Sequence, residues 1–403
     1  MNYKSTRRAC YVGYITQAIV VNLPPLLFAI FQDKFSVSLA YLAALTLVTF
    51  LVQIGIDLLA VKFVESFGYR FLATSSQLVS AVGLVLLSFL PYIIPSEVGL
   101  MIAAVIYSAG SGLTEVVLSP LIESLPAGDE SGSSLAMLHS FYAWGHTLVI
   151  IVTTFLILLV GRDVWYVIPL VWALIPIINA VNFSKVPMVK MMVNKEEHGT
   201  VALFKYKYFI LAFVLMICSG AAEQIMAQWA SFYAEKGLGV TKALGDLLGP
   251  FIFALMMALG RTWYGIKGGK INLAATLLAC SVLCTGCYLV AVFSYSPLIS
   301  LAAIGISGLG VSLMWPGMLS LSAERFTGAG ASMFALMAVG GDIGCSVGPF
   351  ITGTVSEIIE MLPVAQSAVN VESFALKGGI LAGVGFPIVM IVGMIAFAKK
   401  KNN

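Results

Sequence analysis

Charged residues are scarce in this 403-residue chain. Only 10% of its residues are Asp, Glu, Lys or Arg, whereas 60% are apolar, and the mean hydropathy is +0.98. A soluble globular domain carries about 25% charged residues, so this composition excludes a soluble protein. The formal net charge is only +3, and no cluster of basic residues suits a nucleic acid. The partners that we expect are therefore a lipid bilayer and a small-molecule solute.

Nucleotide-binding, catalytic and metal-binding motifs are also missing. The chain has no P-loop, no dinucleotide-binding fingerprint and no zincin motif. Its six cysteines lie almost entirely in apolar segments without zinc-ligand spacing. Cys280, Cys284 and Cys287 share a helical face, but no His or acid accompanies them, so we interpret them as packing residues. We predict no enzyme, no cofactor, no metal and no ATP-driven transport.

Long apolar runs occupy most of the chain. A helix needs roughly 20 apolar residues to cross the hydrocarbon core. The start of the chain resembles a secretory signal, but its apolar run continues past Pro24 and Pro25 without a clear cleavage site, so we interpret it as a span. The prediction is an all-α membrane protein with twelve transmembrane helices at 9–31, 38–61, 71–93, 98–122, 133–160, 164–183, 208–234, 243–264, 271–293, 297–322, 328–356 and 376–398.

Basic residues favour one side of this predicted topology. Of the 22 Lys and Arg residues, 17 fall at the termini and in alternate connections, and the other connections hold the remaining five, which are Lys34, Arg162, Lys236, Lys242 and Lys377. Cytoplasmic loops retain an excess of Lys and Arg. We therefore predict a multi-pass plasma-membrane protein with both termini in the cytoplasm.

The chain divides into two similar halves. Its longest charged connection, 184–207, is the predicted cytoplasmic linker between an N-terminal six-helix bundle at 1–183 and a C-terminal one at 208–403. Basic, glycine-containing connections recur 200 residues apart, at 61–70 and 261–270. Repeated six-helix bundles are typical of transporters that bind solute near the midplane and alternate access by rocking.

Ionised side chains near the centre of a membrane helix cost roughly 2.5–3.5 kcal/mol each. Glu115 falls in the fourth predicted span, Glu223 in the seventh and Asp342 in the eleventh. We expect Glu115 and Glu223 to bind solute or to carry protons, because a desolvated acid can exchange a proton as access alternates. The alternative for all three acids is a structural hydrogen bond between helices, and it weighs most at Asp342.

Other polar and aromatic residues of the spans extend this expected site. His139, Tyr142 and His146 share one helical face, and an amide and an indole close to Glu223 suit a polyol. The alternatives are packing between helices, a simple kink at the two prolines, and a Trp anchor at the membrane interface. The predicted substrate cavity consists of Asn22, Ser119, His139, Tyr142, His146, Gln224, Gln228, Trp229, Trp315 and Asp342.

A separate charged set lies at the cytoplasmic end of the second predicted span. The sequence ESFGYR supplies Glu65, Gly68 and Arg70, and Asp57 precedes it on the same predicted span. An acid, a glycine turn and a base there can clasp a neighbouring helix end. We assign these four residues, with Arg261 close to the end of the eighth predicted span, to a cytoplasmic gate. The alternative is an ordinary charged loop.

Two sequences resemble those of known transporters. ESFGYR resembles the acid-x-x-Gly-x-Arg signature of the major facilitator superfamily, with Glu in place of the usual Asp. GLTEVVLSPLIESL followed by SLAMLHSFYAWG resembles the fourth and fifth spans of the fucose-galactose-proton symporter family. The resemblance implies that Glu115 is the acid that carries the proton or contacts the sugar, and that His139 marks the start of the fifth span.

The chain departs from that family at two positions. Ser119 stands where the family commonly has Asn, and Pro25 stands where its first span carries an acid. Pro25 precedes Glu223 by 198 residues, which is close to the repeat offset. We hypothesise that the second carboxylate has moved to Glu223 and faces one cavity together with Glu115.

These observations predict a monomeric secondary transporter of a small polar organic solute, sugar-like, by proton symport. The main alternative is a proton-coupled efflux antiporter for amphipathic drugs or lipids, which 24 Phe and 17 Met residues would suit. A membrane enzyme or a receptor is disfavoured, because no loop gathers catalytic groups and only the linker offers a signalling surface.

Overall fold

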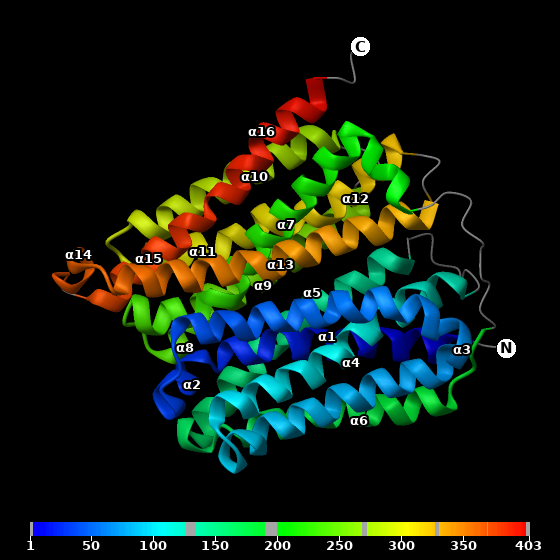
Figure 1. Ribbon diagram of the computed structural model, residues 1–403, viewed down its shortest axis with the longest axis horizontal. Helices are drawn as coiled ribbons and strands as arrows, with labels where there is room; N and C mark the ends of the chain where they lie inside the picture. The colour runs from blue at the N-terminus through cyan, green and yellow to red at the C-terminus, as the bar shows by residue number, and fades with distance from the viewer. Residues whose placement is uncertain are drawn as a thin grey trace. The chain divides into compact units, whose positions relative to one another are not determined.

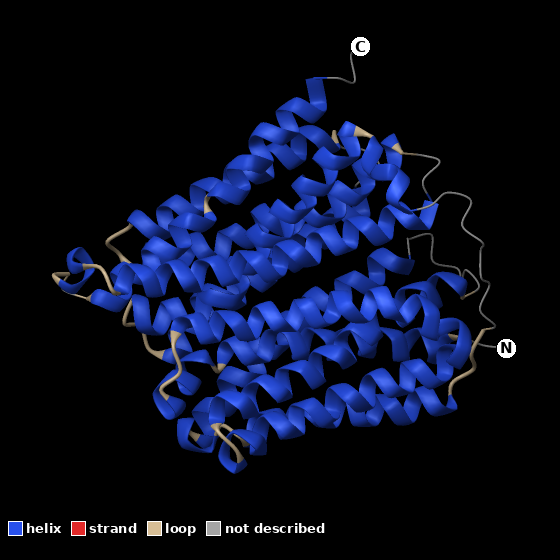
Figure 2. Cartoon of the chain, in the orientation of Figure 1, coloured by secondary structure: helices blue, strands red, loops and turns tan. Residues whose placement is uncertain are grey.

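The chain folds into helices throughout the part that the structure describes. The computed structural model describes residues 3–125, 134–189, 200–267, 272–326, 330–368 and 370–399, and these ranges contain no strand (Figure 2). A chain in lipid must satisfy its backbone hydrogen bonds internally, and an α-helix does so within one segment. The long apolar runs therefore become helices, and the predicted all-α class is confirmed.

The first half of the chain contributes the helices drawn from blue to green-cyan in Figure 1. Their bounds are α1 Lys4–Leu26, α2 Phe28–Phe35, α3 Leu39–Ile93, α4 Ser96–Ser124, α5 Ser134–Val160, the short 3₁₀ turn η1 Arg162–Val164, and α6 Val167–Lys185.

The second half begins with a 3₁₀ turn and includes two π-helical turns, η3 and η4. Its elements are η2 Thr200–Lys205, α7 Lys207–Phe232, η3 Tyr233–Gly237, α8 Lys242–Asp246, η4 Leu247–Phe251, α9 Ile252–Lys267, α10 Leu273–Phe293, α11 Pro297–Ser312, α12 Met314–Arg325, α13 Gly330–Glu360, α14 Pro363–Gln366, α15 Val371–Gly383 and α16 Gly385–Lys399.

The helices supply the predicted number of membrane spans. Eleven described segments are long and apolar enough to cross a membrane, and the bent pair α1–α2 makes the twelfth. Helix α3 supplies two of these spans, Leu39–Ile56 and Phe67–Ile93. Several spans join consecutive elements, such as α11 with α12 and α15 with α16. The twelve-helix fold is therefore confirmed.

Two sharp bends have identifiable causes. Pro24 and Pro25 remove two amide donors from the end of α1, and the axes of α1 and α2 differ by 47°. Gly68 interrupts α3 between its two spans with φ 72° and ψ 160°. A side chain at positive φ is disfavoured, so the reversal of direction at this point requires glycine.

Contacts group the chain into two compact units. Unit 1 comprises Met1–Val37 and Val48–Val193, and unit 2 comprises Ser38–Leu47 and Asn194–Asn403. The division near residue 193 falls within the predicted linker. The start of α3 groups with unit 2, although the predicted domain boundaries assign it to the first half.

In unit 1, α1 packs against α4, α5 and α6. A fully buried amide, Gln77 of α3, links three of the helices around it. Its Oε1 accepts hydrogen bonds from Thr16 Oγ1 of α1 at 2.8 Å and from Asn179 Nδ2 of α6 at 3.2 Å. Its Nε2 donates to Thr114 Oγ1 of α4 at 3.2 Å. This network uses both polar atoms of Gln77 and fixes the helices of unit 1.

In unit 2, α7 packs closely against α13. Small residues on both helices permit this approach. A Cβ atom added at Gly220 would lie 2.2 Å from the Gly341 carbonyl oxygen, and one added at Gly344 would lie 2.0 Å from the Ile217 carbonyl oxygen. No side chain fits at either position, so the backbones of α7 and α13 are in direct contact.

Candidate functional site

Glu115 lies in α4 and is half-buried. Its Oε2 accepts a hydrogen bond from Nε2 of Gln17 in α1 at 2.7 Å. Gln17 is only 6% exposed. The partner of this membrane carboxyl is therefore a neutral amide. Gln17 was not among the predicted site residues, although it lies on the same helix as Asn22, which was.

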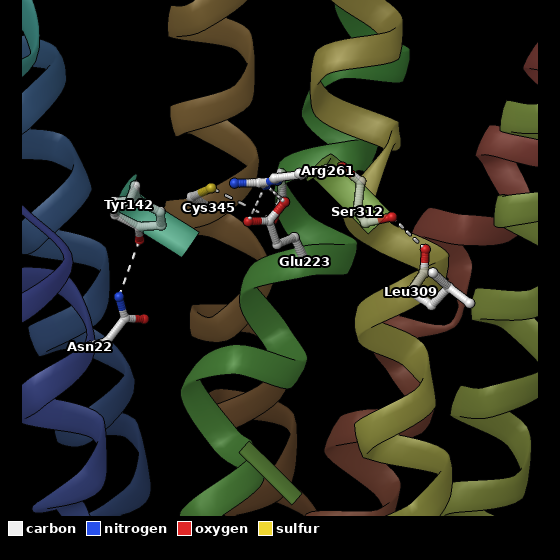
Figure 3. Close-up of polar contacts among 8 residues, drawn as sticks. Asn22, Tyr142, Glu223, Arg261, Leu309, Ser312 and Cys345 are labelled. Carbon is white, nitrogen blue, oxygen red and sulfur yellow. Dashed lines mark hydrogen bonds and ion pairs between the residues drawn. The ribbon is translucent and has the colours of Figure 1, made fainter. Parts of the chain in front are cut away.

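Helix α1 brings four of the predicted cavity residues of unit 1 into two contact groups. The Tyr14 hydroxyl and Ser119 Oγ are 2.6 Å apart, and the Tyr14 ring meets His139 edge-on at 5.3 Å between centroids. Asn22 is buried, and its Nδ2 donates to the Tyr142 hydroxyl at 3.3 Å (Figure 3). Both groups join α1 to α5 or α4 and lie on either side of Gln17 in the α1 sequence.

His146 of α5, another residue of the predicted cavity, is 2% exposed. It lies one turn beyond Tyr142 on α5. Its burial agrees with either of the roles considered for it, which are a relay and an interhelical contact.

Glu223 of α7 meets a cation. The Arg261 guanidinium donates two hydrogen bonds to its carboxylate, from Nη2 to Oε1 at 2.9 Å and to Oε2 at 2.8 Å (Figure 3). The Glu223 and Arg261 side chains are 10% and 13% exposed. Arg261 Nε also donates to the Ser312 carbonyl oxygen at 3.4 Å. Opposite charges thus neutralise each other inside unit 2.

Arg261 pairs with Glu223 within unit 2, and its assignment to a cytoplasmic gate stays a prediction. Helix α9 continues to Lys267, and Arg261 lies within the span Lys242–Tyr264 with its guanidinium on Glu223. An arginine with a long apolar stem can nevertheless remain within a span when a carboxylate neutralises it.

The remaining predicted residues of α7 differ in their surroundings. Gln224 is 4% exposed, and its Nε2 has no hydrogen-bond partner among the described residues. Gln228 accepts a hydrogen bond from Thr46 Oγ1 at 3.3 Å. Trp229 is 1% exposed and donates from Nε1 to the Pro349 carbonyl oxygen at 3.1 Å. This contact anchors Trp229 against α13, as in the packing alternative.

Trp315 and Asp342 lie on neighbouring helices of unit 2. Asp342 of α13 is 4% exposed. The Trp315 ring of α12 covers Gly341, where an added Cβ atom would lie 2.1 Å from its Cη2. The Trp315 ring therefore packs on the residue that precedes Asp342.

The predicted gate of unit 1 is described in part. Arg70 donates to three carbonyl oxygens at the end of α6, those of Phe183 at 3.2 Å, Ser184 at 2.5 Å and Val186 at 2.9 Å. These carbonyls have no partner within the helix, so Arg70 caps α6. Gly68 forms the break just before it. The side chains of Asp57 and Glu65 lie outside the described part of the chain.

A second buried ion pair of unit 2 was not predicted. Lys242 Nζ lies 3.0 Å from Asp246 Oδ1, and the side chains are 9% and 0% exposed. Ser231 Oγ of α7 donates to the same Asp246 oxygen at 2.5 Å. The Lys and Asp are four residues apart at the start of the eighth span, and this spacing is the signal that could have revealed the pair.

Metal-binding geometry is absent from the described residues, among which no group of three or more His, Cys, Asp or Glu side chains could hold an ion. Both units instead bury amides, hydroxyls and carboxylates within apolar spans. Polar side chains are retained inside a membrane mainly where they bind or move a solute. The arrangement defines a class: the protein is a multi-pass membrane protein with polar side chains inside its helical units.

The family follows from a direct match. The family model described as Major Facilitator Superfamily matches residues 10–349, and the chain belongs to this superfamily. The prediction from ESFGYR is therefore confirmed at the level of the superfamily. No curated protein matches the chain.

Solved structures share the fold over nearly the whole chain. A nucleoside transporter, NupG, has a TM-score of 0.77 at 11% identity, and the match covers 97% of this chain and 99% of that one. A D-xylose–proton symporter has a TM-score of 0.74 at 13% identity, with 96% and 97% covered. The E. coli fucose–proton symporter FucP has a TM-score of 0.65 at 14% identity, with 98% and 99% covered.

Proposed function

We propose that this protein is a secondary active transporter that moves a small, sugar-like solute across the plasma membrane by proton symport. Membership of the Major Facilitator Superfamily supports the transport function. The solved structures that share the fold include transporters named for a nucleoside, for D-xylose and for fucose. Those solutes are small and rich in hydroxyl groups, which supports a solute of the same kind here.

The observation that carries the proton-coupling proposal is the pairing of Glu115 with Gln17. A carboxyl group that cycles between charged and neutral needs a partner that tolerates both forms. An amide does so, because it donates to a carboxylate and also pairs with a carboxylic acid. Glu115 meets such an amide at 2.7 Å. Glu223 instead meets the permanent positive charge of Arg261.

Other titratable groups lie on the helices that contact or approach α4. They are Tyr14 of α1, with His139, Tyr142 and His146 of α5. These groups are the candidates for proton delivery to Glu115.

In this proposal, the two predicted bundles, 1–183 and 208–403, alternate access to the solute by rocking about the linker 184–207. The 17-to-5 distribution of Lys and Arg supports cytoplasmic termini. Glu115 takes up its proton together with the solute and releases it on the other side. The hypothesis that Glu115 and Glu223 share one cavity stays a prediction.

The test is uptake into proteoliposomes that contain the purified protein. Labelled L-fucose, D-xylose and uridine are supplied with and without an inward proton gradient. We expect the gradient to drive accumulation of at least one of them, and Glu115→Gln to abolish that accumulation while solute exchange without a gradient continues. Glu97→Gln, a change at the start of the same helix, is the control and should transport normally.

Two results would contradict the proposal. Gradient-driven accumulation that is unchanged in both Glu115→Gln and Glu223→Gln would exclude these acids as proton carriers. Failure to accumulate any of the three solutes, combined with proton-driven extrusion of an amphipathic dye, would establish the efflux alternative.

A further inference from the structure

Gln17 holds an acceptor atom that the fold does not use. Its Nε2 donates to Glu115 Oε2 at 2.7 Å. Its Oε1 is buried, and no hydrogen-bond donor among the described residues reaches it. The side chain belongs to a residue that is only 6% exposed.

An unused buried acceptor is unfavourable by about 1–3 kcal/mol, and most buried polar atoms in native proteins have a partner. Gln77 shows how unit 1 satisfies an amide whose role is structural. Its Oε1 accepts from Thr16 and Asn179, and its Nε2 donates to Thr114. Helix packing therefore explains Gln77 completely, whereas it explains only half of Gln17.

The position of the unused atom points to the solute. Gln17 Oε1 lies on the amide whose other end contacts the half-buried Glu115, so a carbonyl oxygen and a carboxyl group are adjacent. Tyr14, one turn earlier, contacts Ser119 and His139, and these neighbours are hydroxyl and imidazole groups. Adjacent acceptors among neutral polar groups suit the donors of a hydroxylated solute better than they suit an apolar or anionic one.

We infer that Gln17 is a specificity-determining residue: its Oε1 accepts a hydrogen bond from a hydroxyl group of the solute next to the one that Glu115 contacts. This inference rests on the proposed function and narrows it to solutes with two neighbouring hydroxyl groups. Gln17 thus connects the proton site to the solute through one amide, which donates to Glu115 and accepts from the solute.

The test compares each parent solute with analogues that lack a single hydroxyl group. Uptake of uridine, L-fucose and D-xylose is measured beside that of 2′-deoxyuridine and the corresponding monodeoxy sugars, for the wild type and for Gln17→Met. Methionine has a similar length and no hydrogen-bonding amide. The ratio of parent to analogue is measured within one sample, so it does not depend on the fraction of folded protein.

We expect the wild type to prefer a transported parent over one of its analogues by about tenfold, the equivalent of one buried hydrogen bond. In Gln17→Met this preference should fall below about twofold, while preferences at the other hydroxyl groups persist. The matched control is Gln77→Met, which removes an amide of pure packing function. It should lower the amount of active protein and leave the tenfold ratio intact.

The outcomes separate the two proposals. A wild-type preference that persists in Gln17→Met overturns the role of Gln17 and leaves the proposed transport function standing. A wild type that takes up a parent and all of its deoxy analogues equally well would likewise overturn the role of Gln17 and leave the proposed transport function standing. Failure of the wild type to take up any of the three parents contradicts the proposed function, and the assignment of Gln17 falls with it.

Discussion

The two units treat buried charge differently. Unit 2 places two ion pairs in its interior, Glu223 with Arg261 and Lys242 with Asp246, and their side chains are at most 13% exposed. In unit 1, the pairs of Lys34 with Asp163 and of Arg162 with Asp33 are 36–86% exposed. Glu115, a half-buried carboxyl within a span of unit 1, instead meets the amide of Gln17.

This difference separates a fixed charge from an adjustable one. A buried ion pair is stable only while both partners remain, because either charge alone is poorly solvated. An amide partner imposes no such condition on a carboxyl group. The contrast predicts that substitutions at the unit 2 pairs act mainly on stability, and that substitutions at Glu115 act mainly on transport.

The largest effect should come from Arg261→Met. The substitution leaves Glu223 inside the protein without its cation, so we expect a loss of about 3–5 kcal/mol in unfolding free energy. Thermal unfolding of the purified protein in detergent measures it. The double variant Glu223→Leu with Arg261→Met removes both charges and should recover most of the loss. An unfolding temperature equal to that of the wild type in Arg261→Met alone would contradict the pairing.

The next largest difference lies between two equivalent substitutions. Glu223→Gln leaves the Arg261 guanidinium without its counter-charge and should be destabilising by several kcal/mol, about the size of breaking a buried pair. Glu115→Gln keeps a polar group that can pair with Gln17, and we expect a change below about 1 kcal/mol. The same unfolding assay compares them. Equal losses of unfolding free energy in the two variants would contradict the proposed difference between the charged partner of Glu223 and the neutral partner of Glu115.

A smaller effect is expected at the helix end that Arg70 caps. Arg70→Met removes three hydrogen bonds to the α6 terminus, but the residue is exposed, and solvent replaces part of the loss. We expect a loss of about 1 kcal/mol in unfolding free energy. Amide hydrogen exchange should become faster only at the end of α6. Arg70→Lys should not restore protection, because one ammonium group cannot match the planar guanidinium fork. Unchanged exchange in Arg70→Met would show that the cap contributes nothing.

The smallest effect belongs to the exposed pair of unit 1. The Lys34 ammonium donates a hydrogen bond to Asp163 and holds the pKa of that carboxyl below its usual value. A lowered pKa in the folded state means that the pair stabilises the fold above about pH 4 and loses its effect as the pH falls through the folded-state pKa. Asp163→Asn should therefore lower the unfolding temperature slightly at pH 7.

The wild type and Asp163→Asn should converge in acid. Solvent and salt screen exposed pairs, so the difference at pH 7 should also shrink in high salt. A difference that stays constant as the pH is lowered from 7 to the acid limit of the assay would contradict the role of the Asp163 charge.

Hydropathy was sufficient to predict the fold. Length and apolarity determine where a helix can cross a membrane, so the twelve spans and the superfamily followed from composition and two short motifs. The residues at which individual helices end were less predictable. Helix α9 runs to Lys267, three residues beyond the predicted end at 264. The partner of Arg261 lies on another helix, and hydropathy does not reveal it.

The site was predicted less completely than the fold, for a related reason. Glu115 and Glu223 stand out because an ionised group in a membrane is costly. Gln17 carries no charge, so the same reasoning passes over it. Trp229 looked suitable for a sugar, but its indole N–H is occupied by the Pro349 carbonyl oxygen. Only the packing of distant helices decides whether such a residue is available to a solute.

The pair of Glu223 and Arg261 also has a consequence for the insertion of the protein into the membrane during its synthesis. The two residues are 38 positions apart and belong to successive spans. During synthesis, α7 leaves the ribosome before α9 exists. Glu223 therefore enters the bilayer before its arginine is made, or waits beside the translocon until that arginine arrives. The insertion of these two spans is thus a joint event, in which the later helix completes the membrane integration of the earlier one.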